Sequence, residues 1–420
     1  MQKIKLEAAE DFYQSIPKNP AENIAYRIKL HEDLAKDTEK QKDFLTLCWI
    51  DPRICFNTCL WVFDAQDLNH PNKPFILWPH QDPAVATMHQ HIVAANTPGN
   101  EDDRFNIVVN KSRKEGASEI ICKLFFVHWL LKPQMQFLIG SRKEEFVDSG
   151  TLIQGNHVSG DHKTLMHKVC YALTTLPAWM RPQIEKKHRF LENLDNGSCI
   201  AGEETNAHFG AGDRRHGILI DEIGRMEPSI ASAIIDTVAD TSNCIIYNST
   251  HSLDYGISHP FNKLVKQEYG RIKVLELAWW NNPNKRKGMY LSPDYDKVEI
   301  KDLDYYKSRW PEIFRYSREN QSFVLSEFRR KHKETKLAKQ LDKISFVADG
   351  GDSNEGGFRS PWYDREVETR SGRDVATNLD MRPLGAGNNV FDPTTLHRIK
   401  QRCICPPRYK GELNVVYDKD

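Results

Sequence analysis

The chain has 420 residues, of which 39% are hydrophobic and 28% are charged, a composition typical of a globular protein long enough for more than one domain. Lys plus Arg and Asp plus Glu number 58 each, so the formal net charge is zero; this excludes a surface that is basic throughout, as in a general nucleic-acid-binding protein. No apolar run approaches the roughly 20 residues that a membrane span needs, and the first residues lack a signal-peptide core. We therefore expect a cytosolic protein.

The first 60 residues are charged and helix-forming, and we expect an N-terminal helical extension there. Next, PFILWPHQDPAVATMHQHIV (74–93) predicts a short buried strand, a proline turn and a helix. Short apolar strands then alternate with helices, which favours a parallel α/β sheet covered by helices on both faces. The predicted strands are 105–109, 135–140, 216–221, 243–249 and 271–280, and the predicted helices are 118–131 and about 228–239.

The character of the sequence changes after residue 300. A Lys/Arg-rich helix is predicted over about 316–342, and a Gly-rich, acidic loop, VADGGDSNEGG, follows it. We therefore expect a core domain over 61–300 and a small C-terminal lid subdomain over 301–420.

Nine cysteines contain no C-x-x-C pair, and several lie in apolar runs where cysteine acts as a small hydrophobe. We expect free, buried thiols. Metal binding by the close pairs Cys55/Cys59 and Cys403/Cys405 is the alternative.

The segment VVNKSRKEGASEII (108–121) predicts a strand, a tight turn and a helix, the setting of a phosphate-binding loop. Against the pattern G-x-x-x-x-G-K-[ST], Gly116 and Ser118 match, but Ala117 replaces the lysine and Lys111 replaces the first glycine. One cation about 4 Å from a phosphate contributes about 4 kcal/mol at an effective dielectric near 20, so a working site needs a substitute. An ordinary basic turn is the alternative.

We interpret the whole loop as nucleotide-binding, with three cations within reach. Lys111, where the strand ends, is the preferred phosphate cation over Arg113 and Lys114. The predicted loop residues are Lys111, Ser112, Arg113, Lys114, Glu115, Gly116, Ala117 and Ser118.

The apolar strand in GILIDEIGRM (217–226) ends in Asp221 and Glu222. At such a strand end, one carboxylate faces Mg²⁺ and the next faces an attacking water. We predict Ser118 and Asp221 as Mg²⁺ ligands and Glu222 as the general base. A strand that merely ends in an acidic turn is common, but the loop and this strand together favour nucleotide hydrolysis.

Further motifs resemble those of a known family. Asn248, Ser249 and Thr250 close the next strand, as a coupling motif does in helicase-like motors, and FILWPHQ resembles an adenine-recognising Q motif with Gln81 as its amide. NGSCIAGEETNAHFGAGDRRHGILIDE (196–222) and SPWYDREVETRSGRDVATNLDMRPLGAGNNVFD (360–392) resemble large terminases, the DNA-packaging ATPases of tailed bacteriophages. That family's loop, K-x-R-x-x-G-x-[ST], fits Lys111 to Ser118 and implies a displaced lysine.

The resemblance implies an additional-strand P-loop fold (RecA/helicase-like) and Mg²⁺-dependent ATP hydrolysis that translocates double-stranded DNA into a procapsid. It implies as partners a portal ring, a small terminase subunit and four further copies of the chain in a ring of five, in the host cytoplasm. Arg214 or Arg215 would be the arginine finger toward a neighbouring subunit, and Arg113 is the competing finger in cis.

Large terminases continue into a nuclease with clustered aspartates, which we expect only in a longer parent protein. The rival functions are a helicase-like DNA repair ATPase and a nucleotide-binding regulator without turnover. The basic runs RRKHKETKLAK (329–339) and PNKRK (283–287) are expected to be solvated faces, with contacts to DNA phosphates as the alternative.

Overall fold

The computed structural model describes residues 2–100, 102, 104–212, 214–294, 297–309, 322–324 and 358–383. The chain divides into two units, residues 1–287 with 374–386 and residues 288–373 with 387–420. The basic run 329–339, the Gly-rich loop and the Cys403/Cys405 pair lie outside the described residues. The seven cysteines that are described are free and buried, as expected.

The N-terminal segment is helical, as predicted. Asn19, Asp37 and Asp51 cap successive helices, each accepting hydrogen bonds from backbone N–H groups of the following first turn. These helices are not a separate extension, because Tyr13 and Phe44 belong to the same apolar core as the central sheet. Their bounds are α1 (Gln2–Ser15), α2 (Pro20–Leu34), α3 (Thr38–Ile50) and α4 (Pro52–Thr58).

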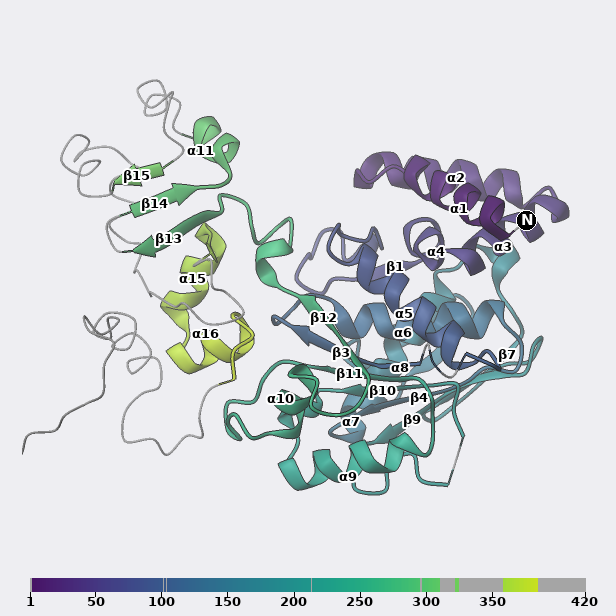
Figure 1. The fold of residues 1–420 in the computed structure, drawn as a ribbon. Helices are drawn as coiled ribbons and strands as arrows, with labels where there is room; N and C mark the ends of the chain where they lie inside the picture. The colour runs from purple at the N-terminus through teal and green to yellow at the C-terminus, as the bar shows by residue number, and fades with distance from the viewer. Residues whose placement is uncertain are drawn as a thin grey trace, which may run out of the picture. The chain divides into compact units, whose positions relative to one another are not determined.

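The centre of the first unit is an eight-stranded sheet in the order β12-β3-β11-β10-β4-β9-β8-β7 (Figure 1). Strands β12 to β9 in this order are parallel, which confirms the predicted class, and β8 and β7 add an antiparallel hairpin that the sequence analysis missed. The strands are β3 (Asn106–Lys111), β4 (Gln136–Ser141), β7 (Ile184–Lys187), β8 (Phe190–Asn193), β9 (Ser198–Glu204), β10 (Gly217–Asp221), β11 (Ile245–Ser249) and β12 (Ile272–Leu277).

Helices cover both faces of this sheet, because its central strands are apolar on both sides. On one face Ile107 and Val109 pack with α5, α6 and α8, and on the other Val108 packs with α9 and α10. The covering helices are α5 (Asp82–Ala95), α6 (Ala117–Leu131), α8 (Leu165–Thr174), α9 (Pro228–Ala239) and α10 (Pro260–Val265). The shorter elements are α7 (Glu144–Val147), η2 (Ala178–Met180), η3 (Ile223–Arg225) and η4 (Trp279–Asn281).

Two small hairpins lie outside the main sheet: β1 (Trp61–Phe63) with β2 (Asn72–Pro74), and β5 (Leu152–Gln154) with β6 (His157–Ser159). The strand expected after Pro74 is absent, since residues 75–81 form no strand. Pro74 and Pro79 have no N–H group to donate to a neighbouring strand, which limits pairing there.

The second unit begins at Gly288, earlier than the expected boundary at 301. The reason is that β13 and β14 pair with each other and with β15 and β16 in a separate four-stranded antiparallel sheet. The chain returns to the first unit within helix α16, since residues 374–386 belong to that unit. The elements are β13 (Tyr290–Asp294), β14 (Lys297–Ile300), α11 (Leu303–Arg309), β15 (Ser322–Val324), β16 (Phe358–Arg359), α15 (Pro361–Thr369) and α16 (Gly372–Asn378).

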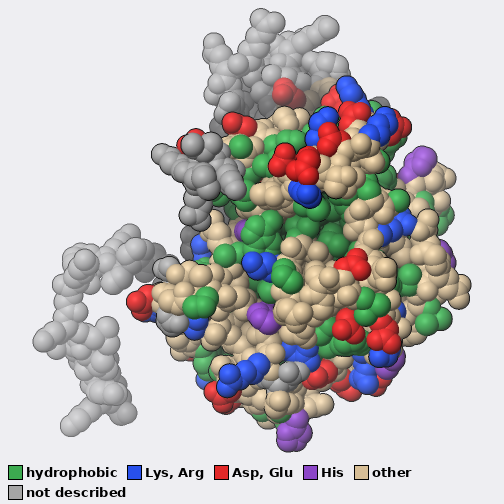
Figure 2. Space-filling view, turned by 90° about the vertical axis from the view of Figure 1, so that its right-hand side faces the viewer, with side chains coloured by type: hydrophobic (Ala, Val, Ile, Leu, Met, Phe, Trp, Pro, Cys, Tyr) green, Lys and Arg blue, Asp and Glu red, His purple; other side chains and the backbone are tan. Residues whose placement is uncertain are grey.

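The surface carries charges of both signs. On the face in Figure 2, Lys and Arg side chains alternate with Asp and Glu, and an apolar area separates the charged clusters. This face therefore offers no basic stripe for a polyanion. Among the described helices, none is long and apolar enough to cross a membrane.

Candidate functional site

The register of the sheet brings the chemistry-bearing strand ends together. Asp221 of β10 pairs with Asn248 of β11, and Ser249 of β11 pairs with Asn110 of β3, one residue before Lys111. The carboxyl ends of β3, β11 and β10 therefore form one edge, with the loop after β3 above it. A single strand, β11, separates the loop strand from the acidic strand.

The loop between β3 and α6 is shaped to receive an anion. Lys114 and Gly116 adopt left-handed backbone conformations, at φ of 62° and 75°. The Lys285 ammonium group donates to the carbonyls of Arg113 (2.8 Å) and Lys114 (3.2 Å), and the Gln81 amide donates to the carbonyl of Glu115 (3.1 Å).

These three carbonyls fix the direction of the opposite N–H groups. The C=O and N–H of a trans peptide are antiparallel, so the N–H groups of residues 114, 115 and 116 point away from Lys285 and Gln81. The N–H groups of residues 114–118 have no hydrogen-bond acceptor in the described part of the chain. They form a run of donors at a helix N-terminus, which is the backbone arrangement that binds phosphate.

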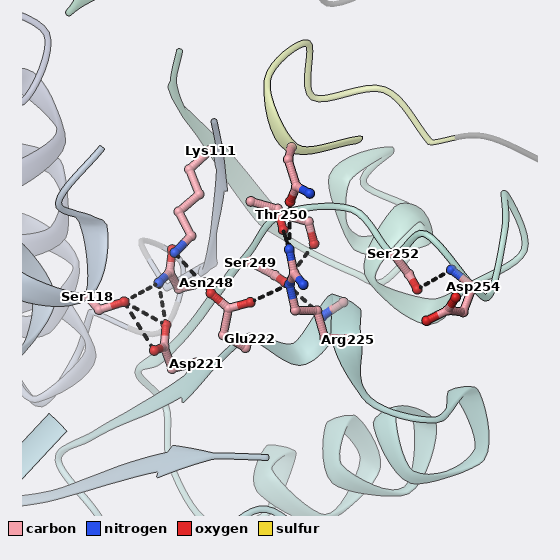
Figure 3. A network of polar contacts seen from close by, with 12 residues as sticks. Lys111, Ser118, Asp221, Glu222, Arg225, Asn248, Ser249, Thr250, Ser252 and Asp254 are labelled. Atoms are coloured by element: carbon pink, nitrogen blue, oxygen red, sulfur yellow. Dashed lines mark hydrogen bonds and ion pairs between the residues drawn. The ribbon is translucent and has the colours of Figure 1, made fainter. Parts of the chain in front are cut away.

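The displaced lysine points at the acidic strand. The Lys111 Nζ lies 3.4 Å from the Glu222 Oε1, and the Lys111 residue is 8% exposed. Arg113 and Lys114, by contrast, are exposed. Lys111 is therefore the loop cation that the fold holds inside the site (Figure 3).

Ser118, Asp221 and Asn248 form a hydrogen-bonded group beneath the loop (Figure 3). The Ser118 hydroxyl donates to the Asp221 carboxylate at 2.9 and 3.1 Å, and the Asn248 amide donates to Ser118 at 3.2 Å and to Asp221. Burial raises the pKa of Asp221 above its usual value, although Lys111 opposes it. A bound cation would stabilise the ionised form of such a buried carboxylate.

A Mg²⁺ ion fits these residues. Hydroxyl and carboxylate oxygens are its ligands, and it prefers one or two carboxylates plus phosphate oxygens and waters to a cage built from protein alone. The buried Asn248 Oδ1 has no hydrogen-bond partner among the described residues, and a water on the ion would supply one. No cluster of three or more His, Cys, Asp or Glu residues suited to another metal occurs in the described ranges.

Glu222 is held between two cations. Its backbone is left-handed at φ 61°, and its N–H donates to the Asn248 carbonyl at 2.7 Å. Lys111 and Arg225 approach its carboxylate from different sides, with the Arg225 Nε 2.8 Å from Oε2 (Figure 3). Burial alone would raise the pKa of Glu222, but the charges of Lys111 and Arg225 outweigh burial and hold its pKa below the usual value. Glu222 is therefore ionised at neutral pH and able to accept a proton.

The predicted coupling residues contact this acidic turn. The Ser249 hydroxyl accepts from the Gly224 N–H at 3.0 Å, and the Thr250 hydroxyl accepts from Arg225 at 3.0 Å. The end of β11 thus contacts both Asp221, the predicted Mg²⁺ ligand, through Asn248, and the turn that carries Glu222.

Two loop side chains face away from the phosphate side. Glu115 is fully buried and pairs with Lys285 and Asn282, and the Ser112 hydroxyl donates to the Leu379 carbonyl at 2.6 Å. The Gln81 amide is also engaged at both ends, since its oxygen accepts from the Trp78 N–H at 3.0 Å. These side chains shape the loop, and adenine recognition by Gln81 stays a prediction.

Arg214 and Arg215 do not reach this site within the chain. They precede β10, at the amino end of the strand, whereas Asp221 ends it. The Arg215 N–H donates to the Thr241 carbonyl, and its guanidinium lies 3.8 Å from Cys199 near the start of β9. A role toward a neighbouring subunit stays a prediction.

Sequence reasoning missed three residues of the site. Lys285 braces the loop, Arg225 contacts Glu222, and Asn378 accepts from Arg225 at 2.6 Å. The run PNKRK contains Lys285 but was expected to be a solvated face. Arg225 could have been found from its position, because a residue three places after Glu222 can reach that carboxylate.

Together, the parallel sheet, the strand inserted between loop and acidic strands, and the clustered Lys111, Ser118, Asp221 and Glu222 define a P-loop NTPase fold of the additional-strand class. No family model and no curated protein matches the sequence.

Solved structures do match, and large terminases of bacteriophages are among them. One, from a thermophilic bacteriophage in complex with ADP, has a TM-score of 0.34 and 11% identity over 47% of this chain and 46% of that chain. The HK97 bacteriophage large terminase has a TM-score of 0.34 and 15% identity over 49% and 40%. The ATPase domain of the Thermus phage P74-26 large terminase has a TM-score of 0.30 and 14% identity over 47% and 83%.

The first two matches span less than half of those terminases' own length. The class therefore rests on the strand order and the site of this chain.

Proposed function

We propose that this chain is the ATPase motor of a viral large terminase, which hydrolyses ATP with Mg²⁺ to translocate double-stranded DNA into a procapsid. The observation that carries the hydrolytic part is the convergence of the unpartnered loop N–H groups, Lys111, Ser118, Asp221 and Glu222 at one sheet edge. The DNA-packaging part is supported by the motifs that resemble large terminases.

The residues divide the reaction among them. The N–H groups of 114–118 and the Lys111 ammonium hold the phosphates. Ser118 and Asp221 would hold Mg²⁺, which would supply positive charge against the negative charge of the phosphates. Glu222 accepts a proton from a water whose oxygen bonds to the γ-phosphorus, while the bond from that phosphorus to the β–γ bridging oxygen breaks and ADP leaves with the electron pair.

The partners follow from the same proposal: double-stranded DNA, a portal ring, a small terminase subunit and copies of this chain in a ring of five, docked on the procapsid in the host cytoplasm. With a net charge of zero, the contact with DNA is local rather than spread over the surface.

The test is phosphate release with ATP and Mg²⁺, with and without double-stranded DNA. We expect turnover stimulated by the duplex. Glu222→Gln should bind ATP like the parent and hydrolyse it at least about 10²-fold more slowly, as is typical for loss of a general base. Binding without turnover in the parent would favour the regulator, and stimulation only by DNA undergoing strand separation would favour the helicase-like ATPase.

A further inference from the structure

The chain segment that returns from the second unit lies on the phosphate loop. The Arg113 N–H donates to the Asn378 carbonyl at 2.6 Å, and the Ser112 hydroxyl donates to the next carbonyl, that of Leu379. Both acceptors belong to the segment 374–386, which is part of the first unit. Asn378 is 1% exposed, so these contacts are made in the interior.

The Asn378 side chain continues from the loop to the acidic turn. Its Oδ1 accepts from the Arg225 Nη2 at 2.6 Å, and its amide nitrogen donates to the Asp374 carboxylate. The same Arg225 nitrogen donates to the Thr250 hydroxyl at 3.0 Å, while its Nε lies 2.8 Å from Glu222. The Arg225 guanidinium thus contacts Glu222, Thr250 and Asn378 together.

The Arg225–Glu222 contact is close but poorly aligned. The Arg225 Nε is buried and makes no hydrogen bond in the described structure, although it lies within ion-pair distance of Glu222. Hydrogen bonds weaken steeply when misaligned, so this contact does not by itself fix the Arg225 guanidinium, although its charge still attracts the Glu222 carboxylate. The two aligned bonds, to Asn378 and Thr250, hold the guanidinium where it is.

We propose that Asn378 is a positioning residue for ATP hydrolysis: it anchors Arg225, which in turn orients the Glu222 carboxylate, and so joins that base to the phosphate loop. The inference rests on the proposed function of the same site. In this role Asn378 acts through Arg225 and not by its own contact with the phosphates or the attacking water. Its effect is on the rate of the chemical step and not on ground-state binding of the nucleotide.

The experiment compares Asn378→Ala, Arg225→Ala and the double variant with the parent, by steady-state hydrolysis and by equilibrium binding of ATP. Asn378→Ala should lower kcat about tenfold and leave the ATP affinity within about twofold, the pattern of a lost transition-state interaction. The double variant should be no slower than Arg225→Ala, because both residues act through one contact.

Two further variants separate positioning from structural damage. Exchanging the partners, Asn378→Asp with Asp374→Asn, keeps an acceptor for Arg225 and should restore most of kcat. Asn193→Ala removes an equally buried amide in β8, whose side chain donates to the Trp129 carbonyl, and should leave kcat unchanged. Arg225→Lys serves as a second test in case Asn378→Ala fails to fold. The Arg225 side chain is 28% exposed, so this variant should fold and should have a lower kcat than the parent.

The outcomes are distinct. If the parent hydrolyses ATP but Asn378→Ala weakens binding at unchanged kcat, Asn378 only braces the loop and the inference is overturned. Additive losses in the double variant, or unchanged kcat in Arg225→Lys, overturn it as well. Absence of hydrolysis in the parent overturns the proposed function together with the inference.

Discussion

Lys111 is the loop cation that the fold holds inside the site, and it is our candidate for the role of the lysine that is missing at position 117. It is the last residue of β3, pairs with Leu277 of β12, and projects across the strand ends to Glu222. A lysine at the strand end therefore reaches the phosphate side of the loop from the opposite direction to one at position 117. The charge of Lys111 is balanced by Glu222, so a γ-phosphate would compete with that carboxylate for the ammonium group.

Removing this ammonium should weaken both binding and turnover. We expect Lys111→Ala to lose on the order of 4 kcal/mol of interaction with the phosphates, because one cation about 4 Å away contributes that much at an effective dielectric near 20. Isothermal titration with ATP and a phosphate-release assay measure the two effects.

Lys114→Ala is the matched control, since Lys114 lies in the same loop but is exposed. It should bind and hydrolyse ATP nearly as the parent does. If Lys114→Ala is inactive and Lys111→Ala is not, the phosphate cation is Lys114 and the loop assignment is wrong.

At the scale of elements, the loop is held from behind. Glu115 is fully buried, and its carboxylate meets Lys285 and the Asn282 amide, while the same ammonium of Lys285 holds the carbonyls of Arg113 and Lys114. The segment after β12 therefore sets the curvature of a loop that lies some 170 residues earlier in the chain.

Lys285→Met should destabilise the protein by about 3–5 kcal/mol, because it leaves Glu115 as a buried charge without its partner. It should also weaken ATP binding, because the two loop carbonyls lose their donor. Chemical denaturation and ATP titration report these separately.

The double variant Lys285→Met with Glu115→Gln tests that separation. It removes both charges, so much of the stability should return, but the carbonyls of Arg113 and Lys114 still lack a donor and binding should stay weak. Recovery of both properties together would show that Lys285 acts on the loop only through Glu115.

The elements that could be predicted from the sequence are those recognisable from a short stretch of neighbouring residues. The strands β3, β4, β10, β11 and β12 and the helix α6 appear within a few residues of their predicted bounds, because each is an apolar run bounded by turn residues. The hairpin β7–β8 escaped notice because its strands are short and half-polar, as IEKK and FLEN show.

The residues that complete the site were not predictable in this way. Arg225 and Asn378 are 153 residues apart in sequence, and Lys285 and Glu115 are 170 apart. Neither pair lies in a motif with fixed spacing, so only the folded chain reveals their contact. The ligand candidates Ser118 and Asp221 were found because each sits at the end of a recognisable strand or loop.

At the scale of the whole molecule, the interior contains several neutral histidines. Burial lowers the pKa of His89, His91 and His251 to about 4 in each case. His91 is 0% exposed, stacks on Phe105 with 4.8 Å between ring centroids, and has no hydrogen-bond partner for either ring nitrogen in the described residues. Protonating such a ring inside the fold is costly.

The consequence is a loss of stability in mild acid, and its sign follows from proton uptake. The folded pKa of His91 is depressed to about 4 from 6.5, so as pH falls below 6.5 the unfolded chain binds the proton first. The contribution of the neutral His91 ring to the free energy of unfolding is fully present above pH 6.5 and is lost as the pH falls toward 4. At pH 5 the loss from this one ring is roughly 2 kcal/mol, at about 1.4 kcal/mol per pH unit.

We expect the Tm of His91→Leu to fall less than that of the parent between pH 7.5 and pH 5, whatever its Tm at pH 7.5. The control is the same substitution at His70, which is exposed. Thermal unfolding at the two pH values decides the matter: an equal drop in His91→Leu and in the parent would mean that the His91 ring is not the buried, proton-excluding group that the structure shows.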